Sequence, residues 1–212
     1  ELIKDVQAIH IHHATRDTQD GEEIFVKELC TDLGVTLNIA KLAWDDKTFS
    51  NFEHKARHKR YREFFSELTN KQFLVLGHHI DDSFEWSLLQ SLKSSHLNSQ
   101  LGIPVRNDRI IRPFMCMTKK QLTSIATDEK INYIEDPTNE HLAFERNYLR
   151  HEVIRPIELR HKKYLKNYVH KSNELARTLG LHIKAISKDY VLNRADDHSW
   201  ILINTRYDNE FE

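Results

Sequence analysis

The sequence predicts an α/β domain with an open parallel sheet and flanking helices, followed by a smaller helical domain. Over residues 6–77, apolar β-branched segments alternate with helical segments. Such strand–helix–strand units join parallel strands through right-handed crossovers. After residue 83 helical patterns dominate. We place the boundary so that residues 1–150 form the α/β domain and residues 151–212 the mainly helical one.

The first crossover is expected between residues 6 and 42. Residues 6–13, VQAIHIHH, alternate as a strand does and end in a polar loop. Residues 22–34 predict a helix that ends at Gly34, a usual C-terminal cap residue. Residues 35–42, VTLNIAKL, predict the second strand. The helix is indicated by four apolar residues near helical spacing: Ile24, Phe25, Leu29 and Leu33.

The second crossover is expected between residues 49 and 77. Residues 49–69 predict a long helix, and FLVLG, residues 73–77, predicts the third strand. The residues of this helix that we expect toward the core are Phe49, Phe52, Ala56, Phe64 and Leu68.

Beyond residue 83 the expected elements are mainly helices. Thr118 and Gln121 have the spacing of a capping box, so a helix is predicted to begin there. Residues 145–188 predict a long helical stretch that breaks near Pro156 and Gly180. Residues 199–204, SWILIN, are either a late strand or an apolar edge packed on the helices.

Composition excludes several classes of protein. The chain has 212 residues, 39% of them hydrophobic, which is enough for a full core. The formal net charge of −1 favours neither a nucleic-acid nor a membrane-surface protein as a whole. Cys30 and Cys116 form neither a disulfide framework nor a CxxC pair. With no membrane-spanning or signal-peptide pattern, we expect a soluble, cytoplasmic protein.

The main candidate site follows the third predicted strand, in HHIDDSFE, residues 78–85. Ligands bind outside the carboxyl ends of strands in open α/β sheets. Asp81 or Asp82 would face the same side of a helix as Glu85 and could hold Mg²⁺ or a substrate ammonium. Alternatively, one aspartate only caps the helix. Carboxylates favour Mg²⁺ over zinc, and no Cys/His cluster completes a zinc site in the sequence.

Arginines form two further candidate groups. Glu53, Arg57 and Arg60 share one side of the predicted helix, where either Glu53 and Arg57 form a surface pair or Arg57 and Arg60 bind an anion. Arg146 and Arg150 share another helix face. Between these groups, EDPTN, residues 135–139, predicts a turn in which Asp136 and Asn139 can bond their own backbone; it means little alone.

The segment from Arg146 to Lys171 is basic, with eight Lys or Arg against two acids. Cations contact phosphates and exposed aromatic rings stack on unpaired bases, so this segment predicts an RNA-binding face. An ordinary solvated helix is the alternative. Three tyrosines are interleaved: Tyr148, Tyr164 and Tyr168. The candidate nucleic-acid contacts are Arg150, Arg155, Arg160, Lys162, Lys163 and Lys166.

The order of these motifs resembles that of the tRNA(Ile)-lysidine synthase family, in the PP-loop ATP pyrophosphatase superfamily. HHxDD follows a strand, with ExxARxxRY before it and RP, EDPTN and RNxxR after it. The strand end HIHHATR resembles the family's HxNHxxR, with His13 and Arg16 matching. The resemblance covers roughly residues 6–160, and it implies a PP-loop ATPase-like catalytic domain followed by a tRNA-contacting one.

The resemblance implies a ligase that uses ATP to adenylate carbon 2 of the wobble cytidine in a CAU-anticodon tRNA(Ile). The amine of L-lysine then displaces AMP to give lysidine. Asp81, Asp82 and Glu85 become candidates to hold Mg²⁺ or the lysine ammonium. Arg57, Arg60 and Arg146 become candidates to bind phosphates and the adenylate. The remaining candidate nucleotide-binding residues are His13, Arg16, His78 and His79. The oligomeric state stays open, with a homodimer among the alternatives.

The chain departs from the family in three places. The SGGxDS loop that binds ATP phosphates through backbone amides is absent, and we expect a complete enzyme to carry it ahead of the first strand here. Residues 92–102, LKSSHLNSQLG, replace an RGSG-like segment. Ser83 and Trp86 stand around Glu85, where the family commonly has Gln and Thr.

Two other functions stay open. A tRNA cytidine 2-thiolating enzyme of the same fold would lean on CxxC pairs, which two isolated cysteines do not supply. A tRNA-binding domain without catalytic activity is compatible with the missing phosphate loop. An α/β scaffold with only surface ion pairs would leave the ordered motifs unexplained.

Overall fold

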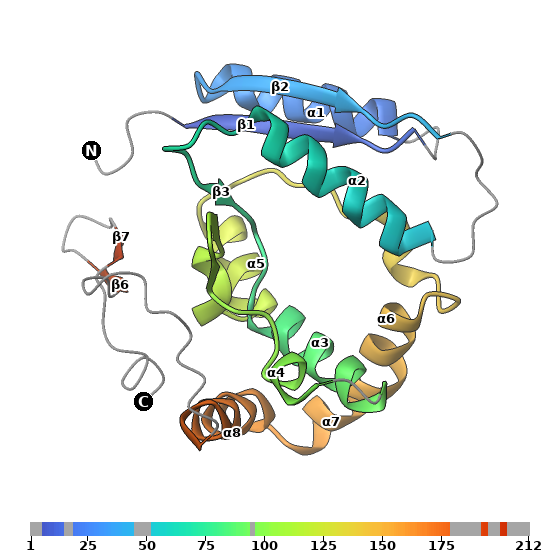
Figure 1. The fold of residues 1–212 in the computed structure, drawn as a ribbon, viewed down its shortest axis with the longest axis vertical. Helices are drawn as coiled ribbons and strands as arrows, with labels where there is room; N and C mark the ends of the chain where they lie inside the picture. Colours follow the sequence, from blue (N-terminus) through green and yellow to red (C-terminus); the bar gives the residue numbers. More distant parts are fainter. Residues whose placement is uncertain are drawn as a thin grey trace. The chain divides into compact units, whose positions relative to one another are not determined.

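The computed structural model describes residues 6–14, 19–44, 52–93, 96–178, 192–194 and 200–202. The chain forms two compact units, Glu1–Leu74 and Val75–Glu212 (Figure 1). Each unit is considered by itself below.

The first unit contains the predicted parallel crossover. Strand β1, Gln7–His12, pairs in parallel with β2, Thr36–Lys41, so that Gln7 lies opposite Thr36. Helix α1, Gln19–Asp32, connects the two strands and begins three residues before the predicted start. Gly34 follows with φ of +63°, a left-handed conformation that suits glycine, and its amide donates to the Thr31 carbonyl at 3.1 Å. The predicted glycine cap of this helix is confirmed.

Helix α2, Phe52–Glu67, confirms the second predicted helix. Ala56 and Phe64 are buried, as the sequence predicts. Leu68 is half-buried and lies just beyond the helix end. Phe49 and the side chain of Phe52 lie outside the described residues. Two of the five expected core positions are therefore confirmed.

A short three-stranded sheet has the order β3-β5-β4. Strand β3, Leu74–Val75, is the predicted third strand in a much shorter form. β4, Arg106–Asn107, and β5, Ile110–Ile111, form an antiparallel hairpin that the sequence interpretation missed. Asp108 has φ of +52° in the loop between them. The cue was the Asn-Asp pair before Ile110, since these residues tolerate left-handed turn conformations.

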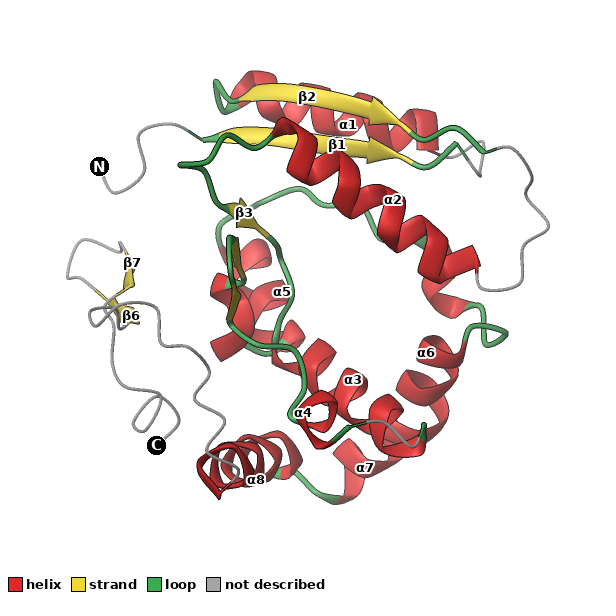
Figure 2. Cartoon of the chain, viewed as in Figure 1, coloured by secondary structure: helices red, strands yellow, loops and turns green. Residues whose placement is uncertain are grey.

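Helices dominate the described part of the second unit (Figure 2). The α-helices there are α3, Ile80–Leu92; α4, Leu97–Gln100; α5, Lys119–Asp128; α6, Glu145–Tyr148; α7, Arg155–Arg160; and α8, Tyr164–Thr178. Two 3₁₀ segments are η1, Pro113–Cys116, and η2, Pro137–Glu140. The predicted capping box opens α5: the Gln121 amide donates to Thr118 Oγ1 at 3.1 Å, and the Thr118 amide donates to Gln121 Oε1 at 2.8 Å.

The predicted break near Pro156 is wrong. The chain continues through α6, a π-helical segment η3, Leu149–Ile154, and α7, and it turns only after Arg160. Pro156 lies in the first turn of α7, where its missing N–H is tolerated, so the proline does not end the helix. Gly180 lies outside the described residues. The domain boundary predicted after residue 150 falls within this helical run and stays a prediction.

The late strand predicted within residues 199–204 is present as β7, Trp200–Leu202. It pairs antiparallel with β6, Leu192–Arg194, which the sequence did not indicate.

The buried apolar side chains of the second unit come from α3, β5, η1, η3 and α8: Leu89, Ile110, Met115, Leu149, Ile154, Val169 and Ala176. This core supports the start of α3, where the candidate site lies. Among the described residues, every helix is too short or too polar to cross a bilayer.

Candidate functional site

Two backbone hydrogen bonds position the start of α3, one just before the HHIDD motif and one within it. The Leu76 amide donates to the Ile111 carbonyl at 2.9 Å, and the Ile80 amide donates to the Met117 carbonyl at 3.0 Å. His79 is the N-cap residue of α3. Its amide donates to Asp82 Oδ2 at 3.0 Å, so Asp82 fills the third-position role of a capping box. The capping alternative is thus present in the structure, through Asp82.

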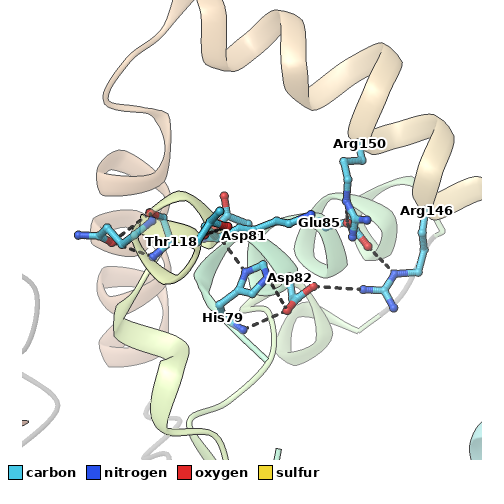
Figure 3. A network of polar contacts seen from close by, with 10 residues as sticks. His79, Asp81, Asp82, Glu85, Thr118, Arg146 and Arg150 are labelled. Atoms are coloured by element: carbon cyan, nitrogen blue, oxygen red, sulfur yellow. Dashed lines mark hydrogen bonds and ion pairs between the residues drawn. The ribbon is translucent and has the colours of Figure 1, made fainter. Parts of the chain in front are cut away.

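The His79 ring lies between the two aspartates (Figure 3). Nδ1 is 3.3 Å from Asp81 Oδ2 and Nε2 is 3.5 Å from Asp82 Oδ2. Asp81 Oδ2 also accepts the Lys119 amide at 2.8 Å. Burial by itself raises the pKa of Asp81, but the hydrogen bonds from His79 and the Lys119 amide outweigh burial and hold this pKa below its usual value. Asp81 is therefore a carboxylate at neutral pH.

Glu85 is the most deeply buried acid of the site, with 2% of its side chain exposed. Its Oε1 accepts a hydrogen bond from Nε of Arg146. Its Oε2 accepts two hydrogen bonds from Arg150, one from Nη2 at 2.8 Å and one from Nε at 3.2 Å. Figure 3 shows both arginines reaching Glu85 from one helical segment. A buried carboxylate needs such partners, so Glu85 joins α3 to the RNYLR motif.

Arg146 also approaches Asp82, with 3.9 Å between its Nη2 and Asp82 Oδ1. The side chains of Arg146 and Arg150 are 40% and 33% exposed, so each guanidinium still meets solvent. The structure therefore brings together four sequence-predicted site residues: Asp82, Glu85, Arg146 and Arg150. An exposed guanidinium beside two acids can bind a further anion and keep its pairing with Glu85.

The EDPTN turn is tied to the arginine-bearing helix. Asp136 Oδ1 accepts the amide of Thr138 at 2.9 Å and its hydroxyl at 2.8 Å, which confirms that Asp136 bonds its own turn. Buried Asn147 donates from Nδ2 to the Thr138 carbonyl at 2.7 Å and to the His141 carbonyl at 3.1 Å. Asn147 was missed as a site residue, although the RNxxR motif contains it. Its amide fixes the turn against the helix that carries Arg146.

A second junction attaches α8 to α3. The Tyr168 hydroxyl lies 3.0 Å from Ser83 Oγ and 3.1 Å from the carbonyls of Ser83 and Leu101. Gly102 has φ of +89°, and a Cβ there would overlap the Tyr168 hydroxyl and Ser83 Oγ. A small cleft lies beside this junction, lined by Ile80, Ser83, Ile103 and Tyr168 among others. Ser83, a departure from the family pattern, thus has a structural role here.

The basic segment keeps most of its positive charge on the surface. Arg155, Arg160, Lys162, Lys163 and Lys166 are exposed, whereas Arg150 is committed to Glu85. This surface is called the α7–α8 basic face below.

The expectation that the interleaved tyrosines could all stack on bases is wrong for two of them. Tyr164 and Tyr168 pack edge-on against Phe84, each with 5.2 Å between ring centroids. Burial, and then the negative charges of Asp81 and Glu158, raise the pKa of Tyr164. Burial also raises the pKa of Tyr168. Tyr148, by contrast, is exposed.

The first unit carries the remaining candidates. Arg57 is exposed; its Nη2 donates to the Tyr61 hydroxyl at 3.2 Å and its Cζ lies 4.8 Å from the Tyr61 ring centroid. Arg60 is half-buried. The indole Nε1 of Trp44 donates a hydrogen bond to the His13 carbonyl at 2.5 Å. Arg16 and the side chain of Glu53 lie outside the described residues. His78 belongs to the second unit and is half-buried next to His79.

Within the described residues, no group of three or more His, Cys, Asp or Glu side chains is arranged to hold a metal by protein ligands alone. Asp81 and Asp82 nevertheless fit Mg²⁺, because Mg²⁺ takes one or two carboxylates and completes its shell with water and substrate phosphates. The low pKa of Asp81 provides one of these charges.

Comparison with known proteins assigns most of this chain to one family. The PP-loop domain family model ATP_bind_3 matches residues 1–157. A tRNA(Ile)-lysidine synthase from Chlorobaculum tepidum is 30% identical over 184 residues, covering 80% of this chain and 54% of that protein. The enzyme of the same name from Legionella pneumophila strain Lens is 32% identical over 157 residues, covering 72% and 36%. That from Pseudomonas aeruginosa is 28% identical over 158 residues, covering 73% and 35%.

The chain thus spans between about a third and about half of the length of these relatives. Among solved structures, the U34-tRNA thiolase NcsA from Methanococcus maripaludis, with its [4Fe-4S] cluster, superposes with a TM-score of 0.63 at 14% identity. The superposition covers 84% of this chain and 63% of the thiolase. This likeness is one of fold and agrees with the predicted parallel sheet and flanking helices.

Proposed function

This chain belongs to the PP-loop domain family, and on that premise we propose that it carries the catalytic region of a tRNA(Ile)-lysidine synthase. The observation that carries the proposal is the cluster in which Asp82 and Glu85 of the HHxDD helix meet Arg146 and Arg150 of the RNxxR motif. Glu85 lies 61 residues before Arg146 and 65 before Arg150, and the two motifs form one charged site. The relatives bearing this name support the choice of reaction.

In the proposed reaction, ATP supplies the adenylyl group that activates carbon 2 of the wobble cytidine, and pyrophosphate leaves. The lysine amine then attacks that carbon, AMP leaves, and the amine loses a proton. The ATP-dependent step agrees with the family match. Mg²⁺, L-lysine, the CAU-anticodon tRNA and a homodimer are parts of the proposal.

The acids of α3 divide the work in this proposal. Asp81 and Asp82 lie at the start of the helix. They would hold two cations, Mg²⁺ and the ammonium group of the lysine substrate. Both oxygens of Glu85 already accept guanidinium groups, so Glu85 positions Arg146 and Arg150 rather than meeting Mg²⁺. This division is our proposal for three residues that the sequence left interchangeable.

The arginines stabilise negative charge in this proposal. Arg146 offers its exposed guanidinium to the adenylate phosphate while Glu85 fixes its orientation. Arg57 and Arg60 on α2 are proposed to bind the leaving pyrophosphate. His13, Arg16, His78 and His79 stay proposed nucleotide contacts. The α7–α8 basic face is proposed to bind the tRNA backbone.

The test is transfer of radiolabelled lysine to a CAU-anticodon tRNA(Ile) transcript by the full-length protein, with ATP and Mg²⁺. We expect label in the RNA and one AMP released per lysine incorporated. A transcript with uridine at the wobble position is the control and should take up no label. RNA binding without incorporation would instead support the tRNA-binding domain without catalytic activity.

A further inference from the structure

Helix α2 carries an unusual concentration of positive charge. From His54 to Arg62 there are five Lys or Arg and no Asp or Glu, in a chain whose formal net charge is −1. The candidate roles given to Arg57 and Arg60 use only part of this charge. The remaining cations lack a role in the proposed chemistry.

Four side chains form one outward row on this helix. His54, His58 and Arg62 follow one another at intervals of four residues, and Lys55 lies seven residues before Arg62, so all four share one side. Each of them is exposed. The His54 and His58 rings lie close together, with 4.5 Å between centroids. We call these four residues the α2 row.

The neighbouring cations are engaged elsewhere. Lys59 donates to the Ala43 carbonyl at 2.5 Å and lies 4.7 Å from the Trp44 ring centroid. Arg57 stacks over Tyr61 and donates to its hydroxyl. Arg62 has one acidic neighbour, Glu63, at 3.4 Å, but its own side chain is 74% exposed. All four side chains of the α2 row are exposed, so a ligand in solvent can reach them.

Helix stability does not explain this charge. Lys55 lies in the first turn of α2, near the positive end of the helix dipole, where cations are destabilising. The last turn, which favours cations, has none. Lys55 and Lys59 also form a like-charge pair four residues apart. A bound polyanion would offset all of these repulsions.

The chemistry of the row favours nucleic acid over a membrane surface. Membrane-binding helices insert large apolar residues beside their basic face. The described side chains of α2 include no exposed large apolar residue. Imidazole and guanidinium groups, by contrast, bind phosphate and also stack on bases. Lys55 and Arg62 are about 10 Å apart along the axis, so the row is extended along the helix rather than gathered at one point.

We propose that the α2 row, His54, Lys55, His58 and Arg62, binds the phosphate backbone of the RNA substrate. The inference rests on the proposed function for the identity of that RNA. It adds a second RNA contact, in the first unit, to the α7–α8 basic face of the second. Arg57 and Arg60 keep their proposed role toward the nucleotide.

The test compares salt-dependent binding of a fluorescein-labelled CAU-anticodon tRNA(Ile) transcript by anisotropy. The full-length protein is measured as wild type, as Lys55→Gln/Arg62→Gln and as the charge-matched control Lys71→Gln/Lys120→Gln. Lys71 and Lys120 are exposed and lie outside the row. We expect the row variant to reduce the slope of log K against log salt by about 1.5, because two phosphate contacts are lost. The control should keep the wild-type slope.

Equal slopes for the row variant and the wild type would overturn the inference. So would a row variant that loses ATP affinity but keeps the RNA slope, because the row would then bind the nucleotide. Thermal unfolding of the row variant should show no loss of stability, since its residues are exposed and Lys55 lies near the positive end of the helix dipole. If the slope falls as expected but wild-type protein transfers no lysine, the row stands and the proposed reaction fails.

Discussion

Replacing Glu85 by glutamine should destabilise the second unit. The substitution keeps the shape of the side chain and removes the charge that holds Arg146 and Arg150. Breaking a fully buried ion pair costs about 3–5 kcal/mol. Here both arginines are at least a third exposed and recover water. We therefore expect a smaller loss of unfolding free energy, about 2 kcal/mol, similar to one hydrogen bond to a charged group.

The matched control is Glu145→Gln. Glu145 pairs with Lys93 at 2.6 Å, but the two side chains are 55% and 54% exposed. The same substitution should therefore cost no more than about 0.5 kcal/mol. Both variants are measured by urea denaturation of the full-length protein, followed by far-UV circular dichroism. A loss for Glu85→Gln no larger than that of the control would refute the idea that this bridge holds the arginine motif against α3.

Three further predictions follow from the same site. Gly102→Ala should lower the unfolding free energy by about 2 kcal/mol, because alanine is strained at a φ of +89° and the Tyr168 hydroxyl leaves no room for its Cβ. Thermal unfolding measures this loss. Asp82→Asn should abolish lysidine formation and leave tRNA affinity largely intact, measured by lysine transfer and anisotropy. The low pKa of Asp81 should stabilise the fold above its unfolded-state pKa, and this contribution should disappear as the pH falls through the folded-state pKa. Asp81→Asn should therefore lose less stability than wild type between pH 5 and pH 3, by denaturation at each pH.

A specific outcome would contradict each of these three predictions. Gly34→Ala, at a left-handed glycine with open space around it, separates backbone strain from overlap, and equal losses for both glycines would remove the packing explanation. Wild-type-like lysidine formation by Asp82→Asn would end its assigned role. If Asp81→Asn and wild type lost equal unfolding free energy between pH 5 and pH 3, the pKa of Asp81 would contribute nothing to stability.

Local patterns predicted the parts of the fold whose cause is local. The parallel β1–β2 pair, α1 and the Thr118 capping box follow from periodicity and cap residues a few positions apart. The β4–β5 hairpin has strands of two residues, which is too short for any alternation to appear. Pro156 looked like a break because its position within the first turn of a helix depends on where the preceding π segment ends.

Most members of the site were predictable from the sequence, but their pairings were not. Helical spacing places Asp82 and Glu85 on one side of α3, yet nothing within that spacing shows that Arg146, 61 residues later, neutralises Glu85. Tyr168 was read as a ring available to bases, whereas its hydroxyl bonds Ser83, 85 residues away. Contacts at such separations arise from packing of the whole unit, so they need the structure.

The π segment η3 has a consequence for how this region can vary between related chains. Across Leu149–Ile154 the helix includes one residue more per hydrogen-bonded ring than an α-helix, as in the Arg155 amide that donates to the Arg150 carbonyl. Because the wider turn of the π segment accommodates one extra residue, removing a single residue there would restore regular α-helix without changing the direction of the helix faces beyond it. Arg146 would stay on Glu85, and Arg155 and Arg160 would keep nearly the same direction. A one-residue gap at this place would leave the α7–α8 basic face in place, whereas the same gap within the regular helix α8 would rotate the residues beyond it by about 100°.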